Sequence, residues 1–307
     1  SDFDLHPALE NFKTLWDQNT ASVFHATSIP YKGRSHFEGQ DMMMSGGTVP
    51  YQEKTGWLGR GMKLAGLTGN GLAMSLPMPL LIRGVPLNNN YFPIRSSLPQ
   101  KHLLNIIAEE FNQYSEKDLS ETLSIIRNRD LNYFPGTNAA TLALEAGKLL
   151  SDPNGPRVAV FKVENFDTHA AQGGENGTHA DCLKEYDQIL KALKASLGST
   201  FKDTLILTLT EFGRTVKQNG GNGTEHGYGT AVLMAGGLIK KSEVHADWPG
   251  LKKKELFQGR DLNATVDARS IYASAMSTVF DVEFERIQKD VFWGEDLQNL
   301  SDKLFKA

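Results

Sequence analysis

Carboxylates and histidines follow the apolar, strand-length runs in the second half of this sequence. Asp167 and His169 come shortly after one such run, and Glu211 comes directly after the next. His226 lies further on, in a loop rich in glycine. Carboxylate oxygens and imidazole nitrogens from separate loops are the donors that zinc and similar divalent ions take, at about 2.0 to 2.2 Å. These four residues are therefore our candidate metal ligands.

Each candidate also has an ordinary structural explanation. Asp167 and His169 could cap a helix or hold a loop by hydrogen bonds, and Glu211 could be a solvated carboxylate paired with Arg214. His226 lies in a stretch with too many glycines to be a packing element. The combination is more informative than any single residue, because three strand-end loops are expected to meet at one edge of a sheet.

The elements that would position these loops follow a regular order. The pattern predicts a strand over 157–163, a helix over 182–197 and a second strand over 204–210. A strand, a crossover helix and a strand imply parallel pairing. A further apolar segment at 230–235 and a helix within 264–280 complete an α/β half, which indicates a doubly wound or three-layer sandwich.

The N-terminal part offers a second kind of candidate. A helix is expected from Ser35 to Met44, with Ser35 as its N-cap and Glu38 closing a capping box. A hydroxyl at a helix N-terminus lies where backbone N–H groups favour a phosphate or sulfate. Ser35 and its neighbour His36 are our catalytic candidates, and plain N-capping is the alternative for Ser35.

Composition narrows the range of functions. With 307 residues, 40% of them apolar, the chain can bury a large core, and its net charge of −4 argues against a nucleic-acid partner. No apolar stretch reaches the roughly 18 to 20 residues that a membrane span needs. A single cysteine, Cys182, rules out an internal disulfide. Among the remaining polar residues, Asp187 is expected on a helix face or at a cap, and His245 on the surface.

An ordered set of motifs resembles the family called domain of unknown function 1501. The motifs are Arg34-Ser35-His36-Phe37, Gly56-Trp57-Leu58-Gly59-Arg60, Asp167-Thr168-His169, Glu211-Phe212-Gly213-Arg214, Thr224-Glu225-His226-Gly227 and Asp247-Trp248-Pro249-Gly250. That family looks like a branch of the alkaline phosphatase and sulfatase superfamily. The resemblance implies an alkaline phosphatase-like three-layer αβα sandwich with a mostly parallel central sheet, as one domain over 1–307. Within it, 45–150 is expected to form an irregular and helical insertion or cap.

The resemblance also implies roles for the residues. Asp167, His169 and His226 would surround one metal ion and Glu211 would serve a second, while Arg34 and Arg214 would hold the oxygens of the substrate. Zinc is the first choice of metal, with manganese or calcium as alternatives. Relatives begin with a glycine-rich strand that bears an aspartate ligand, so we expect residues 1–307 to lack that strand. Relatives are commonly exported, which suggests a periplasmic or secreted protein.

Three functions stay open at this point. The first is a metal-dependent hydrolase of phosphate or sulfate esters, acting on small molecules or glycans. The second is a degenerate relative, without a competent metal site, that binds anionic glycans. Phe212 favours this second function, because it stands where the superfamily has a second histidine ligand. The third is a metal-binding protein without turnover.

Overall fold

The computed structural model describes residues 3–91, 105–107 and 138–306. Contacts divide the chain into two units, one formed by Ser1–Tyr91 with Asn138–Ala307 and the other by Phe92–Thr137. The second unit covers the middle of the predicted insertion, and most of it lies outside the described residues. All the candidate site residues belong to the first unit.

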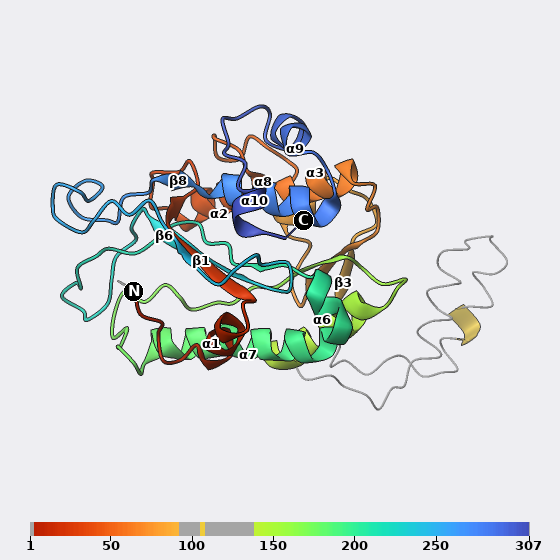
Figure 1. Ribbon diagram of the computed structural model, residues 1–307, viewed down its shortest axis with the longest axis horizontal. Helices are drawn as coiled ribbons and strands as arrows, with labels where there is room; N and C mark the ends of the chain where they lie inside the picture. The colour runs from red at the N-terminus through yellow and green to blue at the C-terminus, as the bar shows by residue number, and fades with distance from the viewer. Residues whose placement is uncertain (1–2, 92–104, 108–137, 307) are drawn as a thin grey trace. The chain divides into compact units, whose positions relative to one another are not determined.

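The first unit is a mixed α/β structure (Figure 1). Its described helices are α1 (Glu10–Asp17), α2 (His36–Ser45), α3 (Trp57–Leu64), η1 (Leu80–Ile82), α6 (Ala139–Ser151), α7 (Thr178–Leu197), η2 (Gly198–Asp203), α8 (Ala268–Phe280), α9 (Phe284–Val291) and α10 (Ser301–Leu304). Its described strands are β1 (Ala21–Ser28), β2 (Gly71–Met74), β3 (Asn89–Tyr91), β4 (Val158–Val160), β5 (Ile206–Leu207), β6 (Thr230–Ala235), β7 (Val244–His245) and β8 (Val266–Asp267).

The strands form two sheets. The larger sheet has the order β5-β6-β1-β7, with β8 also paired to β1, and the smaller sheet has the order β3-β2-β4. In the larger sheet β6 is antiparallel to both β1 and β5, whereas β7 and β8 are parallel to β1. All pairs in the smaller sheet are parallel. The larger sheet is therefore mixed, and only the smaller one is parallel.

The alternation of side chains on β1 explains how helices cover both faces of the larger sheet. Phe24 faces a core shared with α2, α3, α8 and α9, and its neighbour Val23 faces a second core shared with α1, α6 and α7. Figure 1 shows these two groups of helices on opposite sides of β1 and β6. Apolar residues at successive positions are buried because each face of the strand has its own core.

The predicted parallel pairing of 157–163 with 204–210 is wrong. The first run forms β4, which pairs with β2, and the second forms β5, which pairs with β6. Each run was predicted as a strand of seven residues, but the ladders include only Val158–Val160 and Ile206–Leu207. Both strands lie at the end of their sheet in the described part of the chain, so each has a partner on one side only.

The predicted helix at Ser35 is confirmed, but its capping box is wrong. Ser35 is the N-cap of α2, yet its side chain makes no capping hydrogen bond. The hydroxyl of Tyr31 instead accepts a hydrogen bond from the Ser35 N–H at 3.0 Å and donates one to Glu38 at 2.7 Å. Tyr31 thus satisfies the two groups that a capping box would have joined directly.

His245 corrects a second expectation, because it is buried on β7 rather than exposed. Only 6% of its surface is accessible, and its ring stacks on Phe24 of the neighbouring strand. Burial lowers the pKa of this imidazole below 6.5, and the nearby Glu243 only partly opposes the shift.

None of the described helices is long and apolar enough to span a membrane.

Candidate metal site

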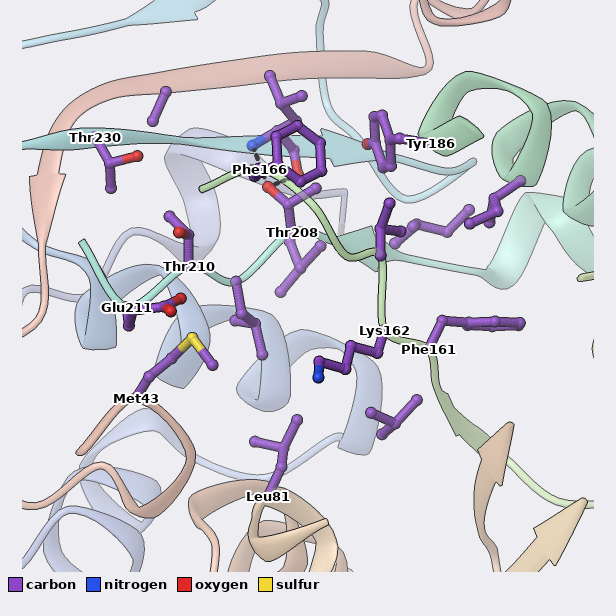
Figure 2. Close-up of a pocket in the computed structure, with 18 of the residues that line it drawn as sticks. Met43, Leu81, Phe161, Lys162, Phe166, Tyr186, Thr208, Thr210, Glu211 and Thr230 are labelled. Carbon is purple, nitrogen blue, oxygen red and sulfur yellow. Dashed lines mark hydrogen bonds between the residues drawn. The ribbon is translucent and has the colours of Figure 1, made fainter. Parts of the chain in front are cut away.

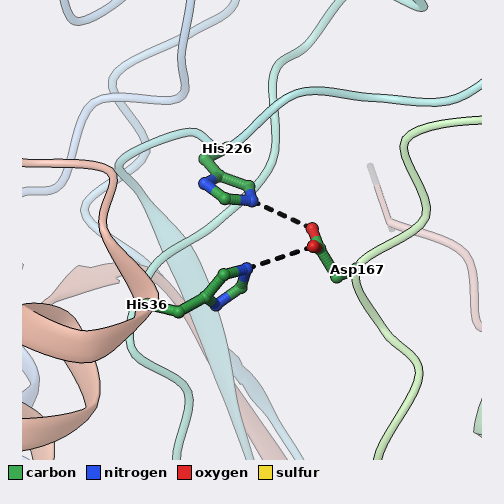
Figure 3. A group of neighbouring side chains, drawn as sticks. All are labelled: His36, Asp167 and His226. Carbon is green, nitrogen blue, oxygen red and sulfur yellow. Dashed lines mark hydrogen bonds and ion pairs between the residues drawn. The ribbon is translucent and has the colours of Figure 1, made fainter.

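Three segments that are distant in the sequence bring His36, Asp167 and His226 together (Figure 3). His36 is the first residue of α2, Asp167 lies in the loop after β4, and His226 lies in the loop before β6. One possible ligand atom of each lies within 4.8 Å of the other two. The His226 Nε2 is 2.9 Å from Asp167 Oδ1, and the His36 Nε2 is 3.2 Å from Asp167 Oδ2.

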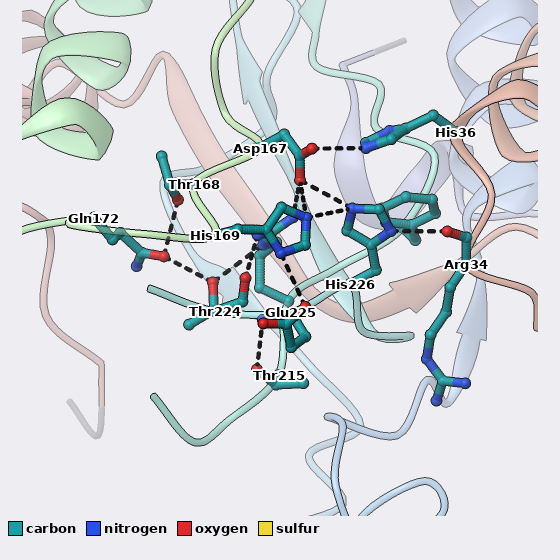
Figure 4. A network of polar contacts seen from close by, with 12 residues as sticks. Arg34, His36, Asp167, Thr168, His169, Gln172, Thr215, Thr224, Glu225 and His226 are labelled. Atoms are coloured by element: carbon teal, nitrogen blue, oxygen red, sulfur yellow. Dashed lines mark hydrogen bonds and ion pairs between the residues drawn. The ribbon is translucent and has the colours of Figure 1, made fainter. Parts of the chain in front are cut away.

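His169 completes this group from the same loop as Asp167. Its Nε2 lies 2.9 Å from Asp167 Oδ1 and 3.0 Å from the Nε2 of His226 (Figure 4). Three imidazoles therefore turn the same ring nitrogen toward one carboxylate. We call His36, Asp167, His169 and His226 the histidine cluster.

The other nitrogen of each imidazole contacts an oxygen of the protein. The His226 Nδ1 lies 2.8 Å from the carbonyl oxygen of Arg34. The His169 Nδ1 lies 2.9 Å from Glu225 Oε2, and the His36 Nδ1 lies 2.8 Å from Glu211 Oε1. A carbonyl or an ionised carboxylate only accepts hydrogen bonds, so each Nδ1 carries the proton and donates it.

This orientation has a consequence for the Nε2 atoms. A neutral imidazole protonated at Nδ1 presents a lone pair at Nε2. In the histidine cluster these lone pairs face the Asp167 carboxylate, and those of His169 and His226 also face each other at 3.0 Å. Such contacts are repulsive unless a proton or a metal cation lies among them. Neutral imidazoles held through Nδ1 are also the form in which histidine binds metals.

Glycines allow the loop that carries His226 to lie against the two loops beside it. A Cβ atom on Gly223 would lie 2.3 Å from the backbone carbon of His169, and one on Gly227 would lie 2.5 Å from that of Arg214. Backbone hydrogen bonds also join these loops. The Thr224 N–H donates to the Thr168 carbonyl at 3.1 Å, and the Gly227 N–H donates to the Gly213 carbonyl at 2.8 Å. The glycine-rich composition therefore serves close backbone approach.

Arg214 holds the Asp167 carboxylate. Its Nη1 donates to Asp167 Oδ1 at 2.5 Å, while its Nε donates to Thr224 Oγ1 at 3.1 Å. Burial favours the neutral form of Asp167, but Arg214 and the neighbouring imidazoles of His226 and His36 outweigh it and hold the pKa of this carboxyl far below its usual range. Burial likewise opposes protonation of His36, but Glu211 and Asp167 outweigh it and raise the pKa of that imidazole.

The remaining predicted site residues lie around this cluster with other partners. Glu211 contacts the far nitrogen of His36 and also accepts a hydrogen bond from Gln40 at 3.1 Å. Arg34 places its carbonyl at His226, but its guanidinium donates to the buried Asp261 at 2.9 Å. The Arg214 guanidinium is likewise engaged, by Asp167 and Thr224.

A cavity of about 2570 Å³ opens from the histidine cluster. The two apolar runs that contain β4 and β5 form much of its wall (Figure 2). His36, Asp167, His169 and Glu211 line this cavity, whereas Ser35 does not. Of our two catalytic candidates, only His36 therefore faces the space where a ligand would bind.

Phe212 packs beneath the imidazoles. Its ring centroid lies 5.0 Å from that of His36 and 4.7 Å from that of His226, and 6% of its surface is accessible. The phenylalanine belongs to the core shared by α2 and α8. It thus contributes an apolar floor to the site rather than a ligand.

Sequence reasoning missed the groups that orient the imidazoles. Glu225 directly precedes His226 in the same motif, and its carboxylate holds the ring of His169. Its position next to a candidate ligand, in a loop of close backbone contacts, is the signal that could have identified it. The Arg34 carbonyl carries no such signal, because a backbone group has no residue type.

Comparisons with curated proteins and with solved structures found no match. The family comparison did find one, which covers the motifs around Asp167, Glu211 and His226 together with those near Asp247. Residues 142–281 match the family described as "Protein of unknown function (DUF1501)", which supports the resemblance to that family over this part of the chain.

Proposed function

We propose that this protein is a metal-dependent hydrolase of phosphate or sulfate esters, built on an alkaline phosphatase-like αβα sandwich and exported to the periplasm or beyond. The observation that carries the proposal is the histidine cluster, in which three Nε2 atoms converge on Asp167 while every Nδ1 has its own oxygen acceptor. One carboxylate oxygen with several imidazole nitrogens is a donor set suited to zinc.

The donor set fits a divalent ion in one further respect. The Nε2 of His36 is buried and has no hydrogen-bond partner, although it lies within ion-pair distance of Asp167. A buried ring nitrogen without a hydrogen bond is costly unless some other group satisfies it. Asp167, His169, His226 and His36 would therefore hold the ion, with manganese or calcium as alternatives to zinc.

In this proposal the protein's own residues bind and orient the substrate. Lewis-acid polarisation of a phosphoryl or sulfuryl oxygen is the chemistry that a bound divalent ion supplies. Arg214 keeps Asp167 ionised and in place, and the cavity beyond Glu211 receives the rest of the ester. Phe212 and the core behind it exclude water from the inner side of the site.

Two observations favour a second function, that of a binding protein for anionic glycans without turnover. Ser35 does not line the cavity, and the guanidiniums of Arg34 and Arg214 already have carboxylate partners. With Ser35 outside the cavity and both arginines paired to carboxylates, a site of this kind can hold a metal and a ligand without cleaving it.

Elemental mass spectrometry on protein purified without chelator tests the proposal. We expect stoichiometric zinc, manganese or calcium in the wild type and none in the Asp167→Ala, His226→Ala double variant. An Asp181→Ala, His6→Ala double variant serves as the control, because it removes the same residue types outside the histidine cluster. Absence of metal from the wild type, even after reconstitution, would contradict the proposal.

Activity then separates the two functions. The metal-loaded protein is assayed with p-nitrophenyl phosphate and p-nitrophenyl sulfate, with the metal-free double variant as the blank. Hydrolysis that requires the metal supports the enzyme. A loaded protein that turns over neither ester leaves the binding protein as the better account, and Ser35→Ala shows whether the serine takes part in any turnover.

A further inference from the structure

His36 has a different role in the structure from the one that sequence reasoning gave it. It was a catalytic candidate because it adjoins Ser35, and Glu211 was expected to bind a second metal. The structure places the two residues in direct contact, at 2.8 Å between the His36 Nδ1 and Glu211 Oε1. This contact bears on the role of both.

We propose that His36 is a metal ligand through Nε2, and that Glu211 is a positioning residue that holds its imidazole rather than a ligand of the same ion. The proposal rests on the proposed function, because it takes as given that a divalent ion binds at Asp167. It goes beyond that function by explaining how His36 is held at the ion and by placing Glu211 outside the ligands of that ion.

The geometry of the imidazole separates the two roles. The ring nitrogens point away from each other, so a group bonded to Nδ1 lies on the far side of the ring from an ion at Nε2. Glu211 contacts Nδ1, whereas Nε2 is turned toward Asp167 Oδ2 at 3.2 Å. In Figure 3 the rings of His36 and His226 both face Asp167, and His36 does so with its Nε2 side.

The partners of Glu211 support a positioning role. Its Oε1 accepts from His36 and also from Gln40, which lies one turn further along α2. Gly39 lets the helix approach this closely, because a Cβ atom there would lie 3.0 Å from the Cβ of Glu211. The carboxylate is thus fixed against α2, the helix whose first residue is His36.

The other two imidazoles of the histidine cluster show the same arrangement. Glu225 holds the Nδ1 of His169 and the Arg34 carbonyl holds that of His226, while both Nε2 atoms face Asp167. Acceptors at the outer nitrogen fix the tautomer and orientation of a metal-binding histidine, and their loss weakens metal affinity about 10- to 100-fold. His36 and Glu211 are the third such pair.

The test uses cobalt(II) as a spectroscopic probe bound to the full chain. The visible absorption of cobalt(II) reports the number and type of its ligands, and titration gives its dissociation constant. We compare the wild type with His36→Gln, Glu211→Gln and a control, His179→Ala, which removes a cavity-lining histidine outside the cluster.

We expect Glu211→Gln to keep the wild-type spectrum and to weaken cobalt binding about 10- to 100-fold. His36→Gln is expected to change the spectrum, because a nitrogen ligand is lost. His36→Gly with added imidazole should regain the wild-type spectrum, which a purely structural role of His36 would not produce. The control should match the wild type in both spectrum and affinity.

The opposite pattern overturns the inference. If Glu211→Gln changes the spectrum while His36→Gln leaves it unaltered, Glu211 is the ligand and His36 the supporting residue. This failure is distinct from failure of the proposed function, because cobalt still binds in that case. Failure of the wild type to bind cobalt, zinc, manganese or calcium overturns both. Circular dichroism of each variant identifies any that fails to fold. In that case the imidazole experiment with His36→Gly decides whether His36 is a ligand or a supporting residue.

Discussion

His169 and His226 meet through their Nε2 atoms, 3.0 Å apart and each 2.9 Å from the same oxygen of Asp167. A contact of this kind needs a proton or a metal cation between the two nitrogens. The loops that carry these residues meet only in the folded chain, so an ion held here would make metal binding and folding stability interdependent.

Zinc should raise the thermal stability of the wild type. A ligand present at 100 times its dissociation constant stabilises the folded state by about 2.7 kcal/mol, which corresponds to roughly 4 °C in Tm for a chain of this size. Differential scanning fluorimetry with zinc, and then with excess EDTA, measures the rise and its reversal. The Asp167→Ala, His226→Ala variant should show neither. An equal rise in that variant would mean that zinc binds elsewhere.

Ser35→Ala should leave the free energy of unfolding almost unchanged, within about 0.5 kcal/mol, because the Ser35 side chain makes no capping hydrogen bond. Asn138→Ala is the matched comparison. The Asn138 side chain accepts from the N–H of Thr141 at 2.9 Å at the start of α6, so its loss should cost about 1 kcal/mol. Urea unfolding compares the two variants. A larger loss for Ser35→Ala would show that its hydroxyl does cap α2 in solution.

Asp187→Ala should destabilise the fold by about 2 to 6 kcal/mol. The buried carboxylate of Asp187, on α7, accepts from the backbone N–H groups of Asn11 at 2.9 Å and Phe12 at 2.8 Å. Its removal leaves first-turn donors of α1 without a partner, at a cost of about 1 to 3 kcal/mol each.

The control for this change is Asp181→Ala on the same helix. Asp181 is 70% exposed and pairs with Lys184 across one turn, so its loss should cost less than about 0.5 kcal/mol. Equal unfolding midpoints for Asp187→Ala and Asp181→Ala would rule out a capping role for Asp187.

His245 should make the fold less stable in mild acid. Its pKa is lowered by burial, so below pH 6.5 the unfolded chain binds a proton that the folded chain does not. Stability from this group is therefore complete above pH 6.5 and is lost as the pH falls toward the lower pKa of the folded state. Urea unfolding between pH 7.5 and 5 should show a shallower decline for His245→Gln than for the wild type. Parallel declines would assign the acid sensitivity to other groups.

Local sequence patterns predicted the strand segments better than their partners. The apolar run 230–235 coincides with β6. The runs 157–163 and 204–210 were identified as strands, but their pairing with each other was wrong. An apolar run reports burial, whereas the choice of partner depends on contacts with β2 and β6, which the run itself does not encode.

The candidate site was likewise predicted only in part. The sequence predicted that Asp167, His169 and His226 lie together, and their side chains do meet. The expected common sheet edge is wrong, because the loop of Asp167 follows β4 of the smaller sheet and the loop of His226 precedes β6 of the larger one. The sequence did not indicate which ring nitrogen faces inward, because that depends on Glu225 and on a backbone carbonyl from another loop. Similarly, the predicted capping box at Ser35 does not form, because the Tyr31 hydroxyl bonds both to the Ser35 N–H and to the Glu38 carboxylate.

Phe212 sets the route by which anything reaches the histidine cluster. Its ring lies against two of the imidazoles and is itself part of the core, so the inner side of the cluster is closed by close-packed apolar groups. Exchange at Asp167, whose side chain is 42% exposed, then occurs from the cavity and from its solvent-facing side. A bulky ester lodged in the cavity would therefore close one of these two routes, and the rate at which a chelator strips the metal would fall as such a ligand is added.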